Sequence, residues 1–196
     1  MARRKSGLDF TRRREKKKLN VPLIREIVFF CVEILIAVGL AYVLVYFLGL
    51  RTTVIGHSME PTLYASDEIM IDRFRYRVSE PKADDVVVFL PNGNEKSHYF
   101  IKRIIGVPGD TVQIIDGEVY VNDEPYEGNG DFPKIADPGI AGEEMRLGTD
   151  EYFVLGDNVN DSEDSRQANI GNISKSHIIG KAWFILSEKE RRGFIK

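Results

Sequence analysis

The sequence predicts a mainly β domain preceded by one N-terminal transmembrane helix. Three observations support this fold class: a long apolar run near the N-terminus, short β-branched runs after it, and an uneven charge distribution. Ten basic and three acidic side chains give residues 1–26 a net charge of +7, whereas 17 basic and 26 acidic side chains give residues 51–196 a net charge of −9. We therefore predict a basic cytoplasmic tail over 1–26, a transmembrane helix over 27–50 and a β domain over 51–196.

The apolar run contains 24 residues and a single charge, Glu33. As a helix it would extend about 36 Å, which exceeds the hydrocarbon core of about 30 Å. Two alternatives remain: a cleaved secretory signal peptide, and a buried helix of a soluble domain. A signal peptide has an apolar core of roughly 7–15 residues and a small-x-small cleavage site. The run is longer than that, and the sequence after Arg51 offers no such site.

The basic excess before the apolar run predicts the orientation of the chain. By the positive-inside rule the N-terminus is cytoplasmic, and the domain after the span lies outside. We expect a single-pass protein of the cell membrane, with Arg12–Lys18 at the anionic inner leaflet of the lipid bilayer. Nucleic acid is the competing partner for this basic stretch, but the stretch lacks interleaved aromatic residues. We therefore expect no nucleic-acid partner.

Residues 51–196 read as short strands. Asp116-Gly117 predicts a tight hairpin between two of them, and the stretch from Asn122 to Asp150 predicts a long surface excursion. The predicted strands are Asp67–Arg73, Asp85–Leu90, His98–Ile105, Thr111–Ile115, Glu118–Asn122, Glu151–Leu155 and His177–Leu186.

Cysteine and histidine limit the chemistry of the domain. Cys31 is the single cysteine, so the sequence predicts no disulfide. The three histidines, His57, His98 and His177, are scattered without the spacing of a metal motif, and we predict no metal and no cofactor.

Lys102 is a candidate general base. It lies in a strand-like run between Phe100 and Ile104 on one face, where burial would disfavour its charged form. A neutral amine accepts a proton, which an arginine cannot do. The alternative is an exposed strand lysine whose stem packs along its neighbours.

Ser58 is a candidate nucleophile. It follows Gly56-His57 and precedes Met59, so we expect it on an exposed turn. A serine hydroxyl needs a base, and Ser-Lys pairs are known alternatives to the histidine triad. Taken alone, Ser58 could equally be an ordinary loop serine, and that alternative remains open. His57 is the competing base, but neighbouring side chains in an extended segment point apart.

Four segments, in order after an apolar span, resemble the type I signal peptidase family: SMEPTL at 58–63, DEIMIDRF at 67–74, KRIIGVPGD at 102–110 and GDNVNDSEDSR at 156–166. The short stretch 111–155 resembles the compact, single-span form typical of Gram-positive bacteria. The resemblance implies the β fold shared with LexA-type repressors. It also implies a membrane-bound serine endopeptidase that removes signal peptides from exported preproteins as they emerge from the translocon, through an acyl-enzyme and without a cofactor.

The same resemblance implies residue roles. Ser58 would attack the scissile carbonyl, and Lys102 would take its proton. The other implied roles are orientation of the lysine amine by Ser162, support of the loop by Asp164 and Arg166, and a substrate pocket near Met59, Leu63, Phe100 and Ile101. One position departs from some relatives, which carry a hydroxyl residue where this chain has Gly56. The identity of the second hydrogen-bond donor to the oxyanion is therefore open.

Two other functions compete with peptidase activity. A LexA-like self-cleaving regulator would share the Ser-Lys chemistry, but it would need an internal cleavage site and a DNA-binding domain, and the sequence shows neither. A non-catalytic β module on a membrane anchor would explain the span and the strands, but it would leave the four ordered segments as coincidence.

Overall fold

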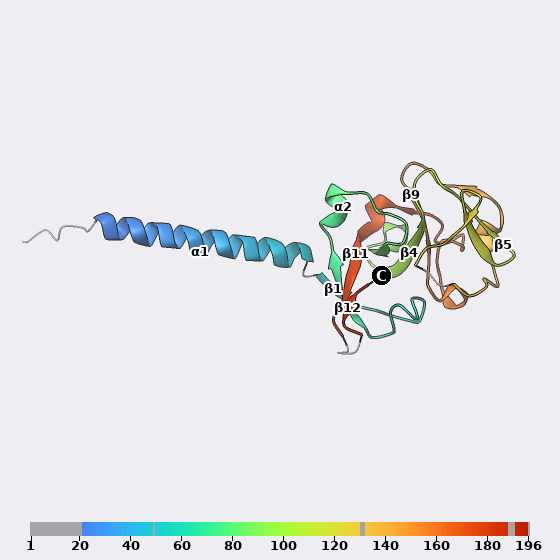
Figure 1. The fold of residues 1–196 in the computed structure, drawn as a ribbon, viewed down its shortest axis with the longest axis horizontal. Coiled ribbons are helices and arrows are strands. Elements are labelled where there is room, and N and C mark those ends of the chain that lie inside the picture. Colours follow the sequence, from blue (N-terminus) through green and yellow to red (C-terminus); the bar gives the residue numbers. More distant parts are fainter. Residues whose placement is uncertain (1–20, 49, 130–131, 188–190, 196) are drawn as a thin grey trace, which may run out of the picture. The chain divides into compact units, whose positions relative to one another are not determined.

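A computed structural model describes residues 21–48, 50–129, 132–187 and 191–195 (Figure 1). Most of the predicted basic tail, residues 1–20, lies outside the described residues. The chain divides into two units that meet between Ala41 and Tyr42, and each is described by itself.

Helix α1 spans Val21–Leu48 and confirms an N-terminal apolar helix, but its bounds differ from the predicted 27–50. It begins six residues earlier because Pro22 is tolerated in a first helical turn, and Arg25 and Glu26 extend the helix. It ends at Leu48, and Leu50 already belongs to a strand. Within α1, Val21–Val43 is long and apolar enough to cross a membrane, and none of this stretch is buried in the protein.

The second unit contains two antiparallel sheets and confirms the mainly β prediction. The large sheet has the order β1-β2-β11-β3-β4-β9-β10, with β12 paired to β11; the small sheet has the order β7-β6-β5-β8. Figure 1 shows β5 of the small sheet on one side of this unit and β1 and β12 on the other.

The bounds of the large sheet are β1 Leu50–Thr53, β2 Glu68–Asp72, β3 Val86–Phe89, β4 Phe100–Gly106, β9 Glu151–Leu155, β10 Ile173–Ser174, β11 Ile178–Ile185 and β12 Gly193–Phe194. Those of the small sheet are β5 Thr111–Ile115, β6 Glu118–Val121, β7 Glu124–Pro125 and β8 Met145–Arg146. The short helical turns are α2 Arg75–Val78, η1 Pro91–Gly93, η2 Gly139–Gly142, η3 Val159–Asp161 and η4 Lys175–His177.

All seven predicted strands form, with ends shifted by two residues at most. The predicted hairpin is present: Asp116 and Gly117 both have positive φ, and Ile115 pairs with Glu118. Positive φ at both central residues is the requirement of a type I′ turn.

The stretch from Asn122 to Asp150 is not only a surface excursion, so that prediction is corrected. It contains β7 and β8, and its side chains Ile135, Ala141 and Leu147 are buried against the small sheet. Single apolar residues among polar ones give no periodic pattern, which is why the sequence did not reveal them.

Candidate active site

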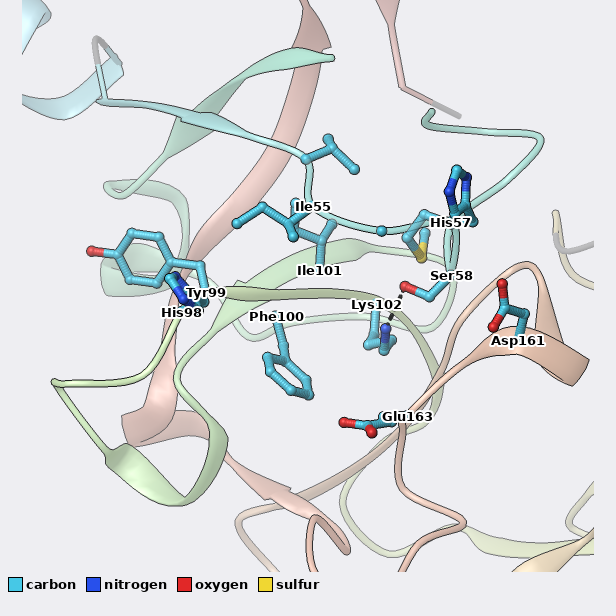
Figure 2. Close-up of a pocket in the computed structure, with 13 residues that line it drawn as sticks. Ile55, His57, Ser58, His98, Tyr99, Phe100, Ile101, Lys102, Asp161 and Glu163 are labelled. Carbon is cyan, nitrogen blue, oxygen red and sulfur yellow. Dashed lines mark hydrogen bonds between the residues drawn. The ribbon is translucent and has the colours of Figure 1, made fainter. Parts of the chain in front are cut away.

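Lys102 and Ser58 meet in the structure. The Nζ atom of Lys102 lies 2.6 Å from the Oγ atom of Ser58, at hydrogen-bonding distance (Figure 2). Ser58 lies in the loop between β1 and β2, whereas Lys102 is the third residue of β4. The fold therefore joins two groups that are 44 residues apart in the chain.

The loop that carries Ser58 is held on both sides. Met59 and Leu63 are buried in the core beside the large sheet, and the Leu63 amide donates to the Met59 carbonyl at 2.8 Å. From the other side, the Asn158 amide donates to the Ser58 carbonyl at 3.0 Å. The nucleophile candidate is therefore fixed on an irregular loop by apolar anchors and backbone hydrogen bonds, and its hydroxyl faces the pocket.

Lys102 is only 4% exposed, and this burial lowers its pKa to about 8. Removal from water disfavours the ammonium form, and the nearby carboxylates, Asp164 first and then Glu163, oppose part of that effect. The ring of Phe100 lies 5.6 Å from Nζ. The amine is therefore neutral in a large fraction of molecules near pH 8, which is the state that a general base requires.

Asp164 and Arg166 form the predicted contact. Their side chains are 0% and 7% exposed and are joined at 2.8 Å. Asp164 also accepts a hydrogen bond from the Gly156 amide at 3.2 Å, and Arg166 donates to the carbonyls of Asp137 and Val159. This buried pair stabilises the loop that follows β9.

The structure shows no hydrogen bond between Ser162 and Lys102. The Ser162 hydroxyl is buried, and within the described residues it has no partner. It nevertheless lies close to the site: a Cβ added at Gly156 would be 2.3 Å from Ser162 Oγ and 2.4 Å from the Ser58 carbonyl oxygen.

A pocket of about 360 Å³ surrounds the Ser58–Lys102 pair. Three of the four predicted pocket residues, Met59, Phe100 and Ile101, line it. Leu63 does not: its side chain is 0% exposed and lies in the core, where it supports the Ser58 loop. The lining also includes residues that sequence reasoning did not assign to the pocket, namely Val54, Ile55, Gly56, His57, His98, Tyr99, Asp161 and Glu163 (Figure 2).

His57 has a partner other than Ser58. Its Nδ1 atom lies 2.7 Å from Glu60 Oε1, and this hydrogen bond raises the pKa of the exposed imidazole. The arrangement agrees with the expectation that adjacent side chains point apart.

Sequence reasoning missed a second buried ion pair beside the first. Arg103, next to Lys102 on β4, is 1% exposed and donates to Asp157 at 2.8 and 2.7 Å. Thr62 also donates to this carboxylate. An arginine within an apolar strand was the available signal, because a buried guanidinium requires an acidic partner.

Among the strands that the structure describes, none pairs with one side of β4 at the pocket. β3 pairs with Phe100–Arg103, but β9 pairs with β4 only from Arg103 onward. The backbone from Phe100 to Lys102 therefore has an open side, and the same residues line the pocket with Val54–Met59. Such an edge suits the addition of an extended peptide. Within the described part of the chain, no group of three His, Cys, Asp or Glu residues is arranged to hold a metal ion.

Comparison with known proteins finds relatives of this chain. The chain is 36% identical over 146 residues to probable signal peptidase I-2 of Synechocystis sp., a match that covers 69% of this chain and 65% of that protein, slightly under two thirds of its length. It is 34% identical over 154 residues to signal peptidase I P of Bacillus subtilis subsp. natto, covering 75% and 82%.

A signal peptidase I structure from Enterococcus faecalis V583 is 24% identical, has a TM-score of 0.42, and covers 53% of this chain and 97% of that one. The model of the family described as "Signal peptidase, peptidase S26" matches residues 27–187. Because that match extends over most of the sequence, and agrees with the family resemblance of the four segments, the chain belongs to the S26 signal peptidase family.

Proposed function

We propose that this chain is a membrane-anchored serine endopeptidase that removes N-terminal signal peptides from exported preproteins with a Ser58–Lys102 dyad. The observation that carries the proposal is the 2.6 Å contact between Lys102 Nζ and Ser58 Oγ, made by a lysine that is 4% exposed. A nucleophile within reach of a base of lowered pKa is the arrangement that acyl transfer requires.

In the proposed reaction the neutral Lys102 amine removes the Ser58 hydroxyl proton as Oγ attacks the scissile carbonyl carbon. The tetrahedral intermediate collapses when the Lys102 ammonium gives this proton to the leaving amine, which frees the mature protein and leaves the signal peptide as an ester on Ser58. Lys102 then removes a proton from a water molecule as its oxygen attacks the ester. The Lys102 ammonium returns this proton to Ser58 Oγ as the signal peptide leaves with a free carboxyl group.

The oxyanion of both intermediates needs hydrogen-bond donors, and the Ser58 N–H is proposed as the first. Gly56 has no side chain to provide the second, and its φ of +80° is a conformation that favours glycine. A backbone N–H or a water molecule is therefore proposed in that place, because loss of one donor costs on the order of 10²-fold or more in rate.

The substrate is proposed to bind as an extended strand along the open side of β4. Alternate residues of a strand point to one face, so the residues at positions −1 and −3 before the cut would both point into the pocket. Met59, Phe100 and Ile101 line the pocket there, and they are proposed to accept small side chains. Ser162 is proposed to orient the Lys102 amine during the reaction.

Helix α1 is proposed as the membrane anchor of a single-pass protein of the cell membrane. Its length and its exposed apolar side chains support this role, and the +7 charge of residues 1–26 supports a cytoplasmic N-terminus. The domain would then lie outside, near preproteins that leave the translocon. Anchoring in the same lipid bilayer raises the effective concentration of such substrates. Protection of this domain from protease added to intact cells would contradict the orientation.

Cleavage of a purified preprotein in detergent tests the proposed chemistry. Ser58→Ala and Lys102→Ala are expected to abolish cleavage, and Lys102→Arg is expected to do the same because a guanidinium does not lose its proton. The matched control is Lys175→Arg, which changes a partly exposed lysine paired with Glu80 and should keep full activity. Full activity of Lys102→Arg would show that the neutral-lysine mechanism is wrong.

A further inference from the structure

Glu163 differs from the other carboxylates around Lys102. Those on the loop after β9 that act on the lysine are Asp157, Glu163 and Asp164. Asp157 is paired with Arg103, and Asp164 is paired with Arg166. Glu163 is exposed and makes no hydrogen bond or ion pair within the residues that the structure describes.

Asp164 acts on Lys102 more strongly than Glu163 does, but each of the two paired carboxylates, Asp157 and Asp164, has a guanidinium beside it. A carboxylate and its guanidinium partner form a dipole, whose field falls off faster than that of a single charge. Consistent with this, Arg166 acts on Lys102 in the direction opposite to Asp164. Glu163 has no guanidinium partner within the described residues, so its removal changes the charge near the amine without leaving a buried guanidinium unpaired.

The position of Glu163 brings this charge into the active-site pocket. Glu163 lines the pocket together with Ser58 and Lys102. Figure 2 shows Glu163 and Ser58 on opposite sides of the Lys102 amine in that view, with Phe100 beside it. A carboxylate at this place leaves the contact between Nζ and Ser58 Oγ intact and still acts on the protonation of the amine.

Among the described residues, the other charged groups near Lys102 are paired or lie outside the principal charges that act on it. The Ser58 loop carries His57 and Glu60, which are paired with each other. Asp161 lines the pocket and acts on His57, and it is absent from the principal charges acting on Lys102. The titratable and charged groups around the lysine are, by element, His57 and Glu60 on the Ser58 loop, His98, Tyr99 and Arg103 on and before β4, and Asp157, Asp161, Glu163, Asp164 and Arg166 after β9.

We infer that Glu163 is a positioning residue that sets the pH range in which Lys102 works as the general base. The inference rests on the proposed function of Ser58 and Lys102. A negative charge near the amine favours its protonated form, so Glu163 holds the onset of activity at a higher pH than the buried site alone would have. Replacement of Glu163 by a neutral isostere therefore makes the enzyme more active at acidic pH, an effect that structural damage does not produce.

The pH dependence of kcat/KM for a peptide substrate tests this inference in the full-length protein in detergent. In the unmodified chain the acidic limb is expected near pH 8, where burial places the pKa of Lys102. Glu163→Gln should move this limb to lower pH by roughly 0.2–0.7 unit, the range expected of one solvent-exposed charge pair. Glu163→Asp keeps the charge and should leave most of the limb in place.

Three controls separate the charge of Glu163 from other effects. Glu118→Gln removes an exposed carboxylate on β6 and should not move the limb. Salt of about 1 M shortens the screening length to roughly 3 Å, so it should move the limb of the unmodified protein toward that of Glu163→Gln. Asp161→Asn removes a carboxylate from the same pocket and should move the limb less than Glu163→Gln does.

A titration without catalysis keeps the inference testable if the substituted enzymes are slow. In a Ser58→Ala background, ¹³C NMR of labelled lysine, assigned with Lys102→Arg, reports the pKa of Lys102 directly. Addition of Glu163→Gln should lower that pKa by the same amount as the kinetic limb. An unchanged pKa, or an equal shift with Asp161→Asn, overturns the role of Glu163. Absence of cleavage by the unmodified protein would instead contradict the proposed function. The NMR titration would then still test the effect of Glu163 on the pKa of Lys102.

Discussion

Arg103 binds Asp157 through two hydrogen bonds of 2.8 and 2.7 Å, directly beside the lysine that contacts Ser58. Both side chains are almost fully buried, at 1% and 4% exposure. The pair joins β4 to the loop after β9, so the strand that carries Lys102 is attached through Arg103 to the segment 156–166. The position of the Lys102 amine therefore depends on a buried ion pair that takes no part in the proposed chemistry.

Asp157→Asn is expected to destabilise the domain by about 3–5 kcal/mol, because it leaves the Arg103 guanidinium buried without an opposite charge. The free energy of unfolding from denaturant titration in detergent measures this change. Glu118→Gln serves as the control, since Glu118 is exposed on β6. The double substitution Arg103→Met with Asp157→Leu should recover most of the loss, and a loss below about 1 kcal/mol for Asp157→Asn would contradict the assigned role.

Lys102→Met is expected to abolish activity and to stabilise the fold at neutral pH, on the order of 2 kcal/mol. The folded-state pKa of Lys102 is about 8, below its usual value of 10.5, so the unfolded chain binds more protons between these two pH values. Stability contributed by this group is therefore present above pH 10.5 and is lost as pH falls toward 8. Denaturant titrations at pH 7 and pH 10 should show a pH-dependent difference that disappears in Lys102→Met. A lower stability of Lys102→Met at pH 7 would contradict this account.

Gly156→Ala is expected to reduce cleavage on the order of 10²-fold, because the added Cβ would lie 2.4 Å from the Ser58 carbonyl oxygen and 2.3 Å from Ser162 Oγ. The backbone of the Ser58 loop has to move to relieve this contact, and with it the nucleophile. Gly193→Ala is the matched control, since nothing lies within 4 Å of a Cβ at that glycine. The measurement is the steady-state rate of preprotein cleavage by both variants. Equal rates would show that the Ser58 loop tolerates the displacement.

The sequence by itself determined the apolar helix, the seven main strands and the turn at Asp116-Gly117. These features depend on local properties: apolar content over a long run, alternation along a strand, and the residues that accept positive φ. The order of four motifs identified the family, and thereby Ser58 and Lys102 as the residues to examine. The chemistry of each residue taken alone is equally compatible with an ordinary structural role for Ser58 and for Lys102.

The tertiary structure decided which of these residues meet. The 2.6 Å contact between Ser58 and Lys102, the burial of Lys102, and the partnership of Arg103 with Asp157 all join segments that are distant in sequence. It also moved Leu63 from the predicted pocket into the core and placed Glu163 in the pocket. The physical reason is that burial and electrostatic coupling depend on distances in space, which strand register and loop packing set and which a linear pattern does not contain.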